Sequence, residues 1–479
     1  MGLLDRPMWE HQVNGVRHVL ENRDFALFFE QGTGKTRTMI EGLRRVYARE
    51  GRMMRTLILC PQIVCTNWQQ EWKMFSKIDP FNVVVLNKTA KQRVNMFIDA
   101  VGEAFTRDKI IITNYEAMQM KELYTCLQHW QPEIIVCDES QRLKSAKGTR
   151  AKLVATLAEQ TKHNFILTGT PILQSPMDAY MQFKILDRGE TFGRNEWAFK
   201  HRYFVDKNAR MPKTVHFPKW EPRDEMYPEL QRKIQAKSMR VLKKDCLDLP
   251  PLVRQLVYVD MSTDQQRAYN EMKRDFLTWI DSKKGEQRAV VATLAVTKAL
   301  RMQQIVSGFA RDEAGVDHWI KDCPRLAELG RLLEDIAPQH KVIVWCSFIE
   351  NYKMVADLCT KLGLDYREIH GGISDRDKQK NMQEFREDSK VRVMIANQAA
   401  GGTGVNLVEA SYMIYYSKNF SLEQDLQSEA RNYRGGSDVH EKVTRIDLVC
   451  RGSIDEMVNE ALAAKQQIGE KILDVKSYG

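Results

Sequence analysis

The sequence predicts an α/β protein with two parallel β-sheets. Short apolar runs recur along the chain, and each is followed by polar or glycine-containing residues and then by a segment with helical spacing. This alternation is typical of parallel sheets covered by helices. At 479 residues, the chain is also too long for one ordinary domain of about 150 residues. We therefore expect two lobes, each with its own sheet.

The expected strands fall into two groups. Those of the first lobe are ALFF (26–29), TLILC (56–60), IIIT (110–113), EIIVC (133–137) and NFIL (164–167). Those of the second lobe are KVIVWC (341–346), VRVMIA (391–396), YMIYY (412–416) and IDLVC (446–450). Ligands of parallel sheets bind beyond the carboxyl ends of the strands, so the residues after each run are the place to look for chemistry.

Charged sequence with helical spacing separates the two groups of strands, from about residue 180 to 330, and we expect helical insertions there. LPP at 249–251 is the expected crossing point. The predicted lobes are residues 1–245, with an insertion at about 180–245, and residues 246–479, with an insertion at about 260–325.

The composition indicates a folded protein without membrane spans. Apolar residues make up 43% of the chain and charged residues 28%, and 72 basic side chains against 63 acidic ones give a net charge of +9. That excess permits a polyanionic partner. The nine cysteines are scattered and form no C-x-x-C pair, which argues for reduced thiols and against zinc. No apolar run of about 18 residues and no signal peptide occurs, so a cytoplasmic location is expected, or the host cytoplasm for a viral protein.

The segment FFEQGTGKTRT (28–38) has the setting of a phosphate-binding loop, because an apolar strand precedes it and a helical pattern follows. Gly32 and Gly34 would let backbone amides approach phosphate, Lys35 would reach the β and γ phosphates, and the Thr36 hydroxyl would coordinate Mg²⁺. The glycine that usually opens this pattern is missing, since Phe29 occupies its position.

Two further strand ends carry candidate chemistry. Asp138 and Glu139 follow EIIVC, where Asp138 would hold Mg²⁺ through water and Glu139 would orient the attacking water. LTGTP (167–171), with Thr168 and Gly169, follows the next strand and would sense phosphate and nucleic acid together.

The order of motifs resembles that of helicase superfamily 2 ATPases, specifically the Swi/Snf family of double-stranded DNA translocases. The resemblance covers nearly the whole chain. It is carried by RPMWEHQVNGV, LILCPQIVCTNWQQEW, IITNYEAM, DESQRLKS, LTGTPILQ, VLKKDCLDLPPL, KVIVWCSF, REIHGGISDRDKQKNMQEF, NQAAGGTGVNL, QSEARNYRGGS and RIDLVCRGSIDEMV.

The resemblance implies two RecA-like lobes that use ATP and Mg²⁺. Arg431 and Arg434 would face the phosphates from the second lobe and complete a catalytic set with Lys35, Asp138 and Glu139. It also implies nucleotide contacts, including the reading of adenine by Gln12. These nucleotide-binding residues are Gln12, Gly32, Thr33, Gly34, Lys35, Thr36, Gly404 and Gln427.

Three positions depart from the family pattern. Gln141 replaces the usual His of the acidic box, at the residue that links hydrolysis to the LTGTP motif. Ala430 replaces an acidic residue before Arg431, and Ser437 replaces a Gln after the arginines. None of these changes removes a group expected to touch phosphate or metal.

Nucleic acid would be held at loops following the strands, where backbone amides and small polar groups suit phosphates and carry no sequence preference. Trp68 and Trp72, four residues apart, are expected in the core rather than as a pair that stacks on bases. The expected nucleic-acid contacts are Pro61, Gln62, Asn114, Tyr115, Thr168, Gly169, His370, Gly371, Gly401 and Gly402.

The resemblance implies a DNA-dependent ATPase that moves along the backbone of double-stranded DNA as its lobes close and open, and that remodels forks or displaces bound protein. Forked or single-stranded DNA are further candidate substrates, and no membrane is involved. A strand-separating DNA or RNA helicase is an alternative. A second alternative, of another class, is a non-hydrolysing ATP-gated DNA clamp or scaffold.

Overall fold

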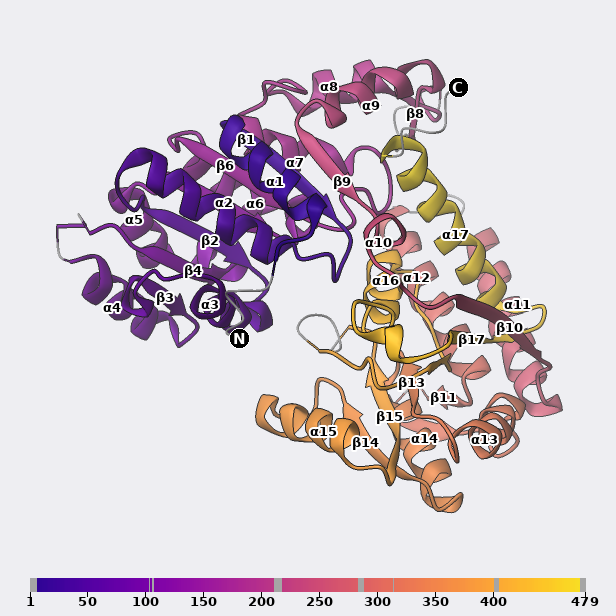
Figure 1. Cartoon of the computed structure of the whole chain (residues 1–479). Helices are drawn as coiled ribbons and strands as arrows, with labels where there is room; N and C mark the ends of the chain where they lie inside the picture. Colours follow the sequence, from indigo (N-terminus) through magenta and orange to yellow (C-terminus); the bar gives the residue numbers. More distant parts are fainter. Residues whose placement is uncertain are drawn as a thin grey trace. The chain divides into compact units, whose positions relative to one another are not determined.

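The chain forms two compact units, shown in Figure 1, in a computed structural model that describes residues 7–102, 104–105, 107–210, 218–282, 288–312, 314–399 and 405–473. The first unit comprises Met1–Leu247 and the residues from Lys465 onward, and the second comprises Asp248–Ala464. Gly401, Gly402 and Gly404 lie outside the described residues. No helix in the described ranges is both long enough and apolar enough to cross a membrane.

A seven-stranded sheet of entirely parallel strands forms the first unit, in the order β3-β4-β2-β5-β6-β1-β9. Every residue of β1, β2, β4 and β5 is buried, as expected for strands covered on both faces. The strands are β1 (Asp24–Phe29), β2 (Thr56–Cys60), β3 (Val83–Leu86), β4 (Ile110–Asn114), β5 (Ile134–Asp138), β6 (His163–Leu167) and β9 (Ser238–Val241).

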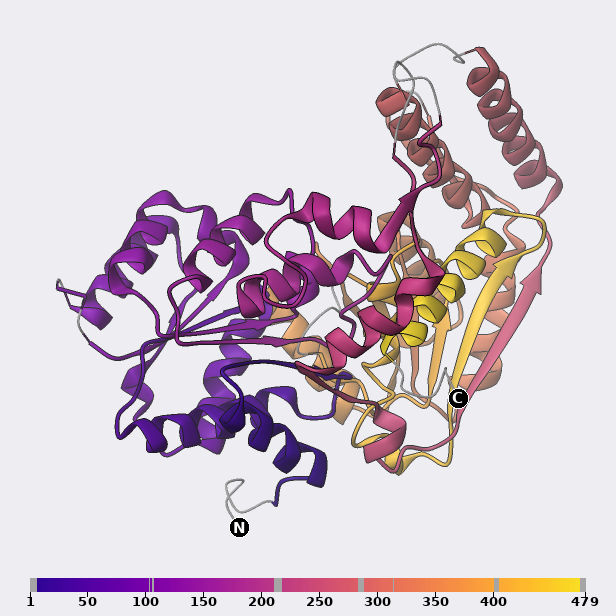
Figure 2. The same ribbon diagram turned by 90° about the horizontal axis from the view of Figure 1, so that it is seen from above.

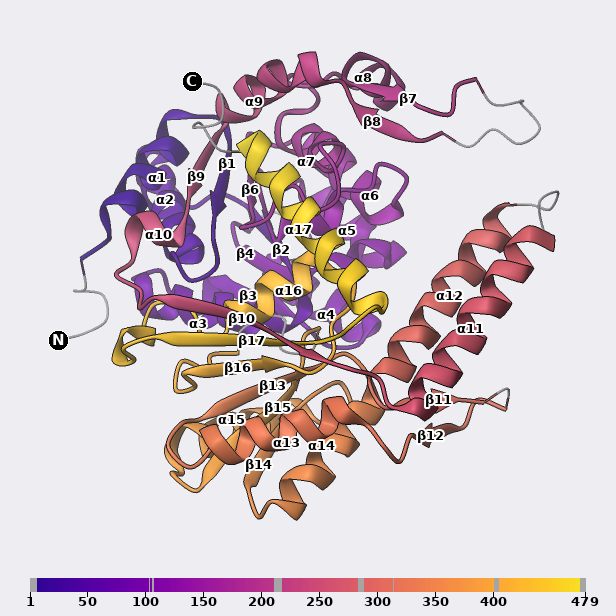
Figure 3. The same cartoon turned by 90° about the vertical axis from the view of Figure 1, so that its right-hand side faces the viewer.

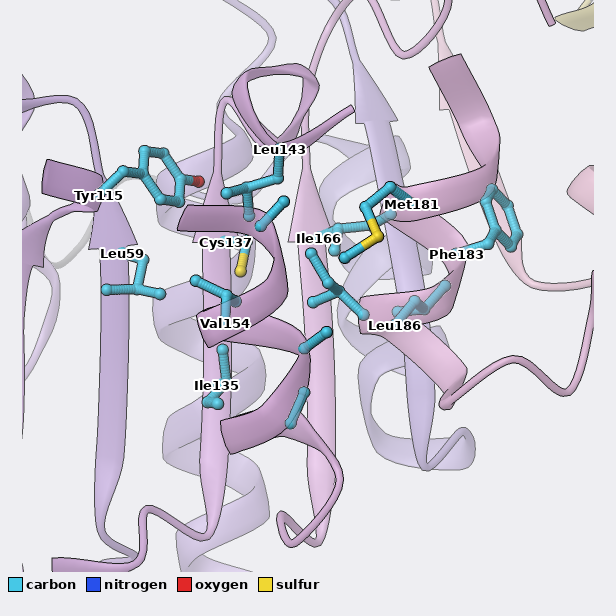
Figure 4. Packing of buried hydrophobic residues seen from close by; sticks show 14 of the residues in the cluster. Leu59, Tyr115, Ile135, Cys137, Leu143, Val154, Ile166, Met181, Phe183 and Leu186 are labelled. Carbon is cyan, nitrogen blue, oxygen red and sulfur yellow. The ribbon is translucent and has the colours of Figure 1, made fainter. Parts of the chain in front are cut away.

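Helices cover both faces of this sheet. One face packs against α1 (Glu10–Glu21), α2 (Lys35–Glu50) and α3 (Cys65–Phe75). The opposite face packs against α4 (Ala90–Val101), α5 (Lys121–Trp130), α6 (Thr149–Ala158) and α7 (Asp178–Asp187). Figure 4 shows part of this second core, in which Val154 of α6 and Met181 and Leu186 of α7 face Ile135 and Ile166 of the sheet.

The insertion that follows α7 contains α8 (Glu196–Tyr203), α9 (Tyr227–Gln235), α10 (Lys243–Cys246) and a small antiparallel pair, β7 (Phe204–Asp206) and β8 (Trp220–Pro222). It ends by adding β9 to the sheet beside β1. The end of α17 (Ile454–Leu473) also joins the core of the first unit, through Ile472 and Leu473.

The second unit has a six-stranded parallel sheet in the order β10-β17-β16-β13-β15-β14. Helices α13 (Pro324–Ile336) and α14 (Ile349–Lys361) cover one face, and Phe385 of α15 (Asp375–Glu387) packs on the other. The strands are β10 (Leu252–Val259), β13 (Val342–Cys346), β14 (Asp365–Ile369), β15 (Val391–Asn397), β16 (Tyr412–Tyr415) and β17 (Val443–Cys450).

A helical hairpin projects from this unit. It is formed by α11 (Thr263–Ser282) and α12 (Arg288–Val306), which lie side by side in Figure 2 and Figure 3. A short antiparallel pair, β11 (Phe309–Arg311) and β12 (Asp317–Trp319), follows it. The expected α/β fold with two parallel sheets and helical insertions is therefore confirmed.

All nine predicted strands are present as parallel strands, but four strands of the two sheets were missed. β3 and β14 lie between predicted strands, while β9 and β10 lie where only helices were expected. β10 is an edge strand with most of its side chains exposed, and β9 has just four residues, so neither carries a continuous apolar run.

Candidate nucleotide and nucleic-acid site

The glycine-rich loop connects the end of β1 at Phe29 to the start of α2 at Lys35. Gly32 (φ +88°) and Gly34 (φ +83°) adopt left-handed conformations that other residues rarely reach. A Cβ atom on Gly34 would also lie 2.0 Å from Nε2 of Gln12. The Lys35 ammonium donates to the carbonyl of Phe29 at 3.1 Å, so the lysine already folds back over the loop.

The missing first glycine has a simple explanation. Phe29 is the last residue of β1, is fully buried and does not have a positive φ. A bulky residue therefore fits at this position, while the two glycines that need left-handed backbone are retained.

The start of α1 contacts this loop. Gln12 is 2% exposed, accepts from the Trp9 amide at 3.0 Å and donates to the Thr33 carbonyl at 3.5 Å. The ring of His11 lies closer to the same carbonyl, with 2.8 Å from Nε2 to the oxygen. The structure therefore places Gln12 against the glycine-rich loop, together with His11, which was not among the predicted residues.

The acidic pair lies at the carboxyl end of β5 and is buried, with Asp138 4% and Glu139 7% exposed. Indole Nε1 of Trp68 donates to Oδ2 of Asp138 at 2.8 Å, and the Tyr115 hydroxyl donates to the Asp138 carbonyl at 2.5 Å. Burial raises the pKa of Asp138 to about 6, the charge of Glu139 adds to this rise, and Lys35 opposes it.

Gln141 links the acidic pair to the LTGTP motif. Its Nε2 donates to Oε2 of Glu139 at 2.7 Å, and its Oε1 accepts from the Thr168 hydroxyl at 2.6 Å. A continuous chain of hydrogen bonds thus joins the acidic pair to the LTGTP loop. That loop also lies against the phosphate loop, since a Cβ atom on Gly169 would be 3.1 Å from the Phe29 carbonyl.

The expected nucleic-acid residues of the first unit differ in exposure. Gln62 is exposed, whereas the side chains of Pro61, Asn114, Tyr115 and Thr168 are buried. Tyr115 and Thr168 therefore use their hydroxyls within the protein, as described above.

Arg93 of α4 connects two of these loops, although the sequence analysis did not find it. Its guanidinium donates to Oδ1 of Asn114 at 2.5 Å and to Oε1 of Gln62 at 3.2 Å. The loops after β2 and β4 are thereby fixed to one buried cation, whose pKa is lowered mainly by desolvation.

In the second unit, Gln427 lies on α16 (Leu422–Glu429), and Arg431 and Arg434 lie in the turn that follows. Gln427 is 5% exposed and donates to Glu423 at 3.3 Å. Arg431 is 4% exposed and donates to the Val405 carbonyl at 3.5 Å, while Arg434 is partly exposed.

A buried charge network anchors α16. Arg445 of β17 pairs with Asp425 at 2.8 Å, with Glu429 at 2.9 Å and with Asp447 at 3.2 Å. Its guanidinium also lies 4.0 Å from the ring centre of Tyr415. The network fixes the helix from which the Arg431–Arg434 turn departs.

His370 and Gly371 follow β14. The imidazole of His370 stacks on the Tyr352 ring with centroids 4.7 Å apart, and its Nδ1 accepts from the Gly372 amide at 3.2 Å. Burial lowers the pKa of His370, so the neutral ring is favoured at pH 7. Gly371 is exposed, and its backbone is accessible.

A glycine loop before a helix, with an acidic pair after another parallel strand of the same sheet, is typical of the phosphate-binding-loop ATPases. Residues 11–307 match the SNF2-related domain, and residues 324–436 match the helicase conserved C-terminal domain. The chain belongs to the SNF2-related family. The predicted resemblance and its two RecA-like lobes are thereby confirmed.

Two proteins with sequences similar to this chain are considerably longer. An uncharacterized ATP-dependent helicase of Mycoplasma genitalium is 24% identical over 471 residues, which cover 97% of this chain and 42% of that protein. The CHD3-type chromatin-remodeling factor PICKLE of Arabidopsis thaliana is 24% identical over 474 residues, which cover 93% of this chain and 32% of the relative. The chain therefore spans less than half the length of either relative.

A solved structure of the SWI2/SNF2 ATPase core of Sulfolobus solfataricus in complex with dsDNA also resembles the chain. It has 21% sequence identity and a TM-score of 0.44, with 98% of this chain and 94% of that chain covered.

Proposed function

We propose that the protein is a DNA-dependent ATPase that moves along double-stranded DNA. The observation that supports this proposal best is that the glycine loop and the acidic pair both lie at the carboxyl ends of strands of the same sheet. Lys35 is close enough to Asp138 to oppose the rise that burial causes in the pKa of that carboxyl group, although the two residues lie on different elements.

The residues at this edge fit a nucleoside triphosphate with Mg²⁺. Amides of Gly32, Thr33 and Gly34 and the positive end of α2 suit phosphate oxygens, and Lys35 adds a cation. Thr36 and Asp138 would hold Mg²⁺, with the remaining positions left to phosphate and water. The ion would neutralise charge that develops on the phosphates.

Glu139 would orient the attacking water, and Gln141 positions its carboxylate. Because Gln141 also bonds Thr168, a shift of the LTGTP loop changes the position of Glu139. The second unit would contribute Arg431 and Arg434 to the transition state, as in families that stabilise phosphoryl transfer with arginine. Gln427 and Gly404 would add nucleotide contacts.

Double-stranded DNA is the proposed partner, because the chain belongs to the SNF2-related family and carries a net charge of +9. Gln62, Gly169, His370, Gly371, Gly401 and Gly402 would provide contacts to the backbone, and buried Asn114 would position Arg93 between the two loops. Pro61, Tyr115 and Thr168 would shape these loops from within.

ATPase rates with duplex DNA, single strands and RNA test the substrate directly. We expect the strongest stimulation by duplex DNA, and stimulation mainly by RNA would favour the strand-separating alternative. DNA-dependent release of phosphate would exclude the ATP-gated clamp.

Two variants separate nucleotide binding from hydrolysis. Lys35→Ala removes the cation at the phosphates and should weaken both ATP binding and turnover. Glu139→Gln keeps the shape of the side chain and should retain ATP binding while turnover is lost. Equal loss of ATP affinity in both variants would show that the two roles are misassigned.

The role of Arg434 is tested by Arg434→Ala, with exposed Arg451 of the same unit as a matched control. Arginine fingers contribute about 10³ to 10⁵ in rate, so Arg434→Ala should nearly abolish hydrolysis while ATP and DNA affinity remain. Arg451→Ala should leave the rate unchanged. Retained turnover in Arg434→Ala would refute the assignment.

A further inference from the structure

Helix α8 carries aromatic residues on two opposite faces. Phe199 and Tyr203 point into the first unit, where both rings pack against Phe192 with centroids 5.1 and 5.9 Å away. Trp197 and His201, also four residues apart, lie on the other face. The Trp197 side chain is 66% exposed, and its ring stacks on His201 with centroids 3.8 Å apart. The buried face therefore fixes a helix whose outer face presents a large apolar ring to solvent.

The neighbouring hairpin extends this surface. Trp220 of β8 meets the edge of the His201 ring with centroids 5.0 Å apart, and Figure 3 shows α8 beside β7 and β8. His201 is held in place by a 2.9 Å hydrogen bond from its Nδ1 position to the Trp197 carbonyl. Trp197, His201 and Trp220 thus form a preordered set of rings, which we call the aromatic row.

Lysines and arginines are close to the aromatic row in sequence. The described residues 194–210 and 218–225 contain seven Lys and Arg side chains and five Asp and Glu. Arg194 is 73% exposed, Lys219 63% and Lys207 54%, so they extend into solvent even where a carboxylate lies nearby. Exposed aromatic rings within a basic surface are the combination by which proteins bind single-stranded nucleic acid without reading sequence.

We propose that the aromatic row binds unpaired nucleotides, with a base stacked on Trp197 and phosphates held by the surrounding lysines and arginines. In a duplex both faces of each base are covered by its neighbours, so an exposed indole can stack only on a base that is unpaired or at an end. The row therefore favours a single-stranded segment over a duplex. This site goes beyond the proposed motor function, and it requires neither ATP nor the residues around Lys35.

The ring on which the proposal depends is tested by Trp197→Ala, with Trp319→Ala as the control. Trp319 is also exposed, by 45%, but lies on β12 in the second unit. The assay is binding of a fluorescent thymidine 12-mer and of a blunt 20-base-pair duplex to the full chain without nucleotide. Loss of one stacked base should weaken 12-mer binding by roughly tenfold in Trp197→Ala, while duplex binding remains within about twofold and Trp319→Ala matches the parent.

Two further measurements test the contribution of charge and the integrity of the fold. The double variant Lys207→Ala, Lys219→Ala should reduce the salt dependence of 12-mer binding by about 0.7 per lost phosphate contact. Trp197 is exposed, so its variant should unfold at the same urea concentration as the parent.

Three results would overturn the proposal. The first is unchanged 12-mer binding by Trp197→Ala, and the second is an equal loss for the duplex. The third is displacement of the 12-mer by poly-glutamate as effectively as by unlabelled strand, which would assign the surface to acidic polypeptides. None depends on ATP hydrolysis, so failure here and failure of the proposed motor function can be told apart.

Discussion

Replacement of Trp68 by Phe should reveal how the acidic pair is held. Trp68 and Trp72 lie one turn apart on α3, with 0% and 1% exposure. The Trp68 indole donates to Asp138, whereas the indole N–H of Trp72 has no hydrogen-bond partner in the described part of the chain. Both Phe variants remove the same atoms from the same core, so Trp72→Phe is a matched control for the lost volume.

The two variants should differ in stability by about 3 kcal/mol. Trp68→Phe loses a hydrogen bond to a charged group, worth about 1.5–3 kcal/mol, while Trp72→Phe removes a buried unpaired donor that costs about 1–3 kcal/mol. We would measure urea unfolding at pH 8, where Asp138 is ionised because its pKa is about 6. Trp68→Phe should also lower the ATPase rate more than Trp72→Phe. Equal shifts of the two urea midpoints would refute the proposed support of Asp138 by Trp68.

Three further predictions concern buried polar groups. Glu133 pairs with Arg52 and Lys162, and hydrogen bonds from both hold its pKa near 2 although burial opposes this. Because both partners are largely exposed to solvent, Glu133→Gln should lower the free energy of urea unfolding at pH 7 by only about 2 kcal/mol. Because this pKa is lowered on folding, the stabilisation is present above about pH 4.5. The difference in unfolding free energy between Glu133→Gln and the parent should therefore shrink as the pH falls toward 2. A difference that does not change with pH would contradict the role of the carboxylate charge. Arg445→Met should destabilise the second unit by about 3–5 kcal/mol in thermal unfolding, since it leaves buried carboxylates without their cation, and an unchanged Tm would disprove this role. Gln141→Ala should reduce ATP turnover about tenfold with ATP affinity retained, and turnover at the parent rate would show that the link is not used.

Much of the fold could be predicted because buried parallel strands are continuous apolar runs. TLILC became β2 without a change of bounds, EIIVC differs from β5 by one residue at each end, and KVIVWC differs from β13 by one residue at its start. β14 (DYREI) is polar enough to hide its strand character, and its side chains are mostly half-buried. The missed strands β9, β10 and β14 thus depend on hydrogen bonding to a neighbouring strand more than on a continuous apolar run, whereas the missed β3 (Val83–Leu86) is apolar and mostly buried.

The site was predictable where function depends on local sequence. The glycine loop and the acidic pair are contiguous motifs, so their spacing is visible in the chain. Trp68 and Arg93 could not be found in this way, because each acts on residues at a distance, 70 positions away for Asp138 and 21 for Asn114. The prediction that Trp68 lies in the core is confirmed, and its indole N–H also donates a hydrogen bond to Asp138.

The position of β1 within its sheet has a consequence for biosynthesis. β1 carries the start of the phosphate loop, yet its two neighbours are β6 and β9, which are made much later. At about 5–20 residues per second, β9 emerges roughly 10–40 s after β1. During this interval DFALFF is an apolar strand without its final partners, and such segments promote aggregation. Conditions that slow translation between residues 30 and 238 should therefore lower the soluble yield, and chaperones that bind extended apolar chains should restore it.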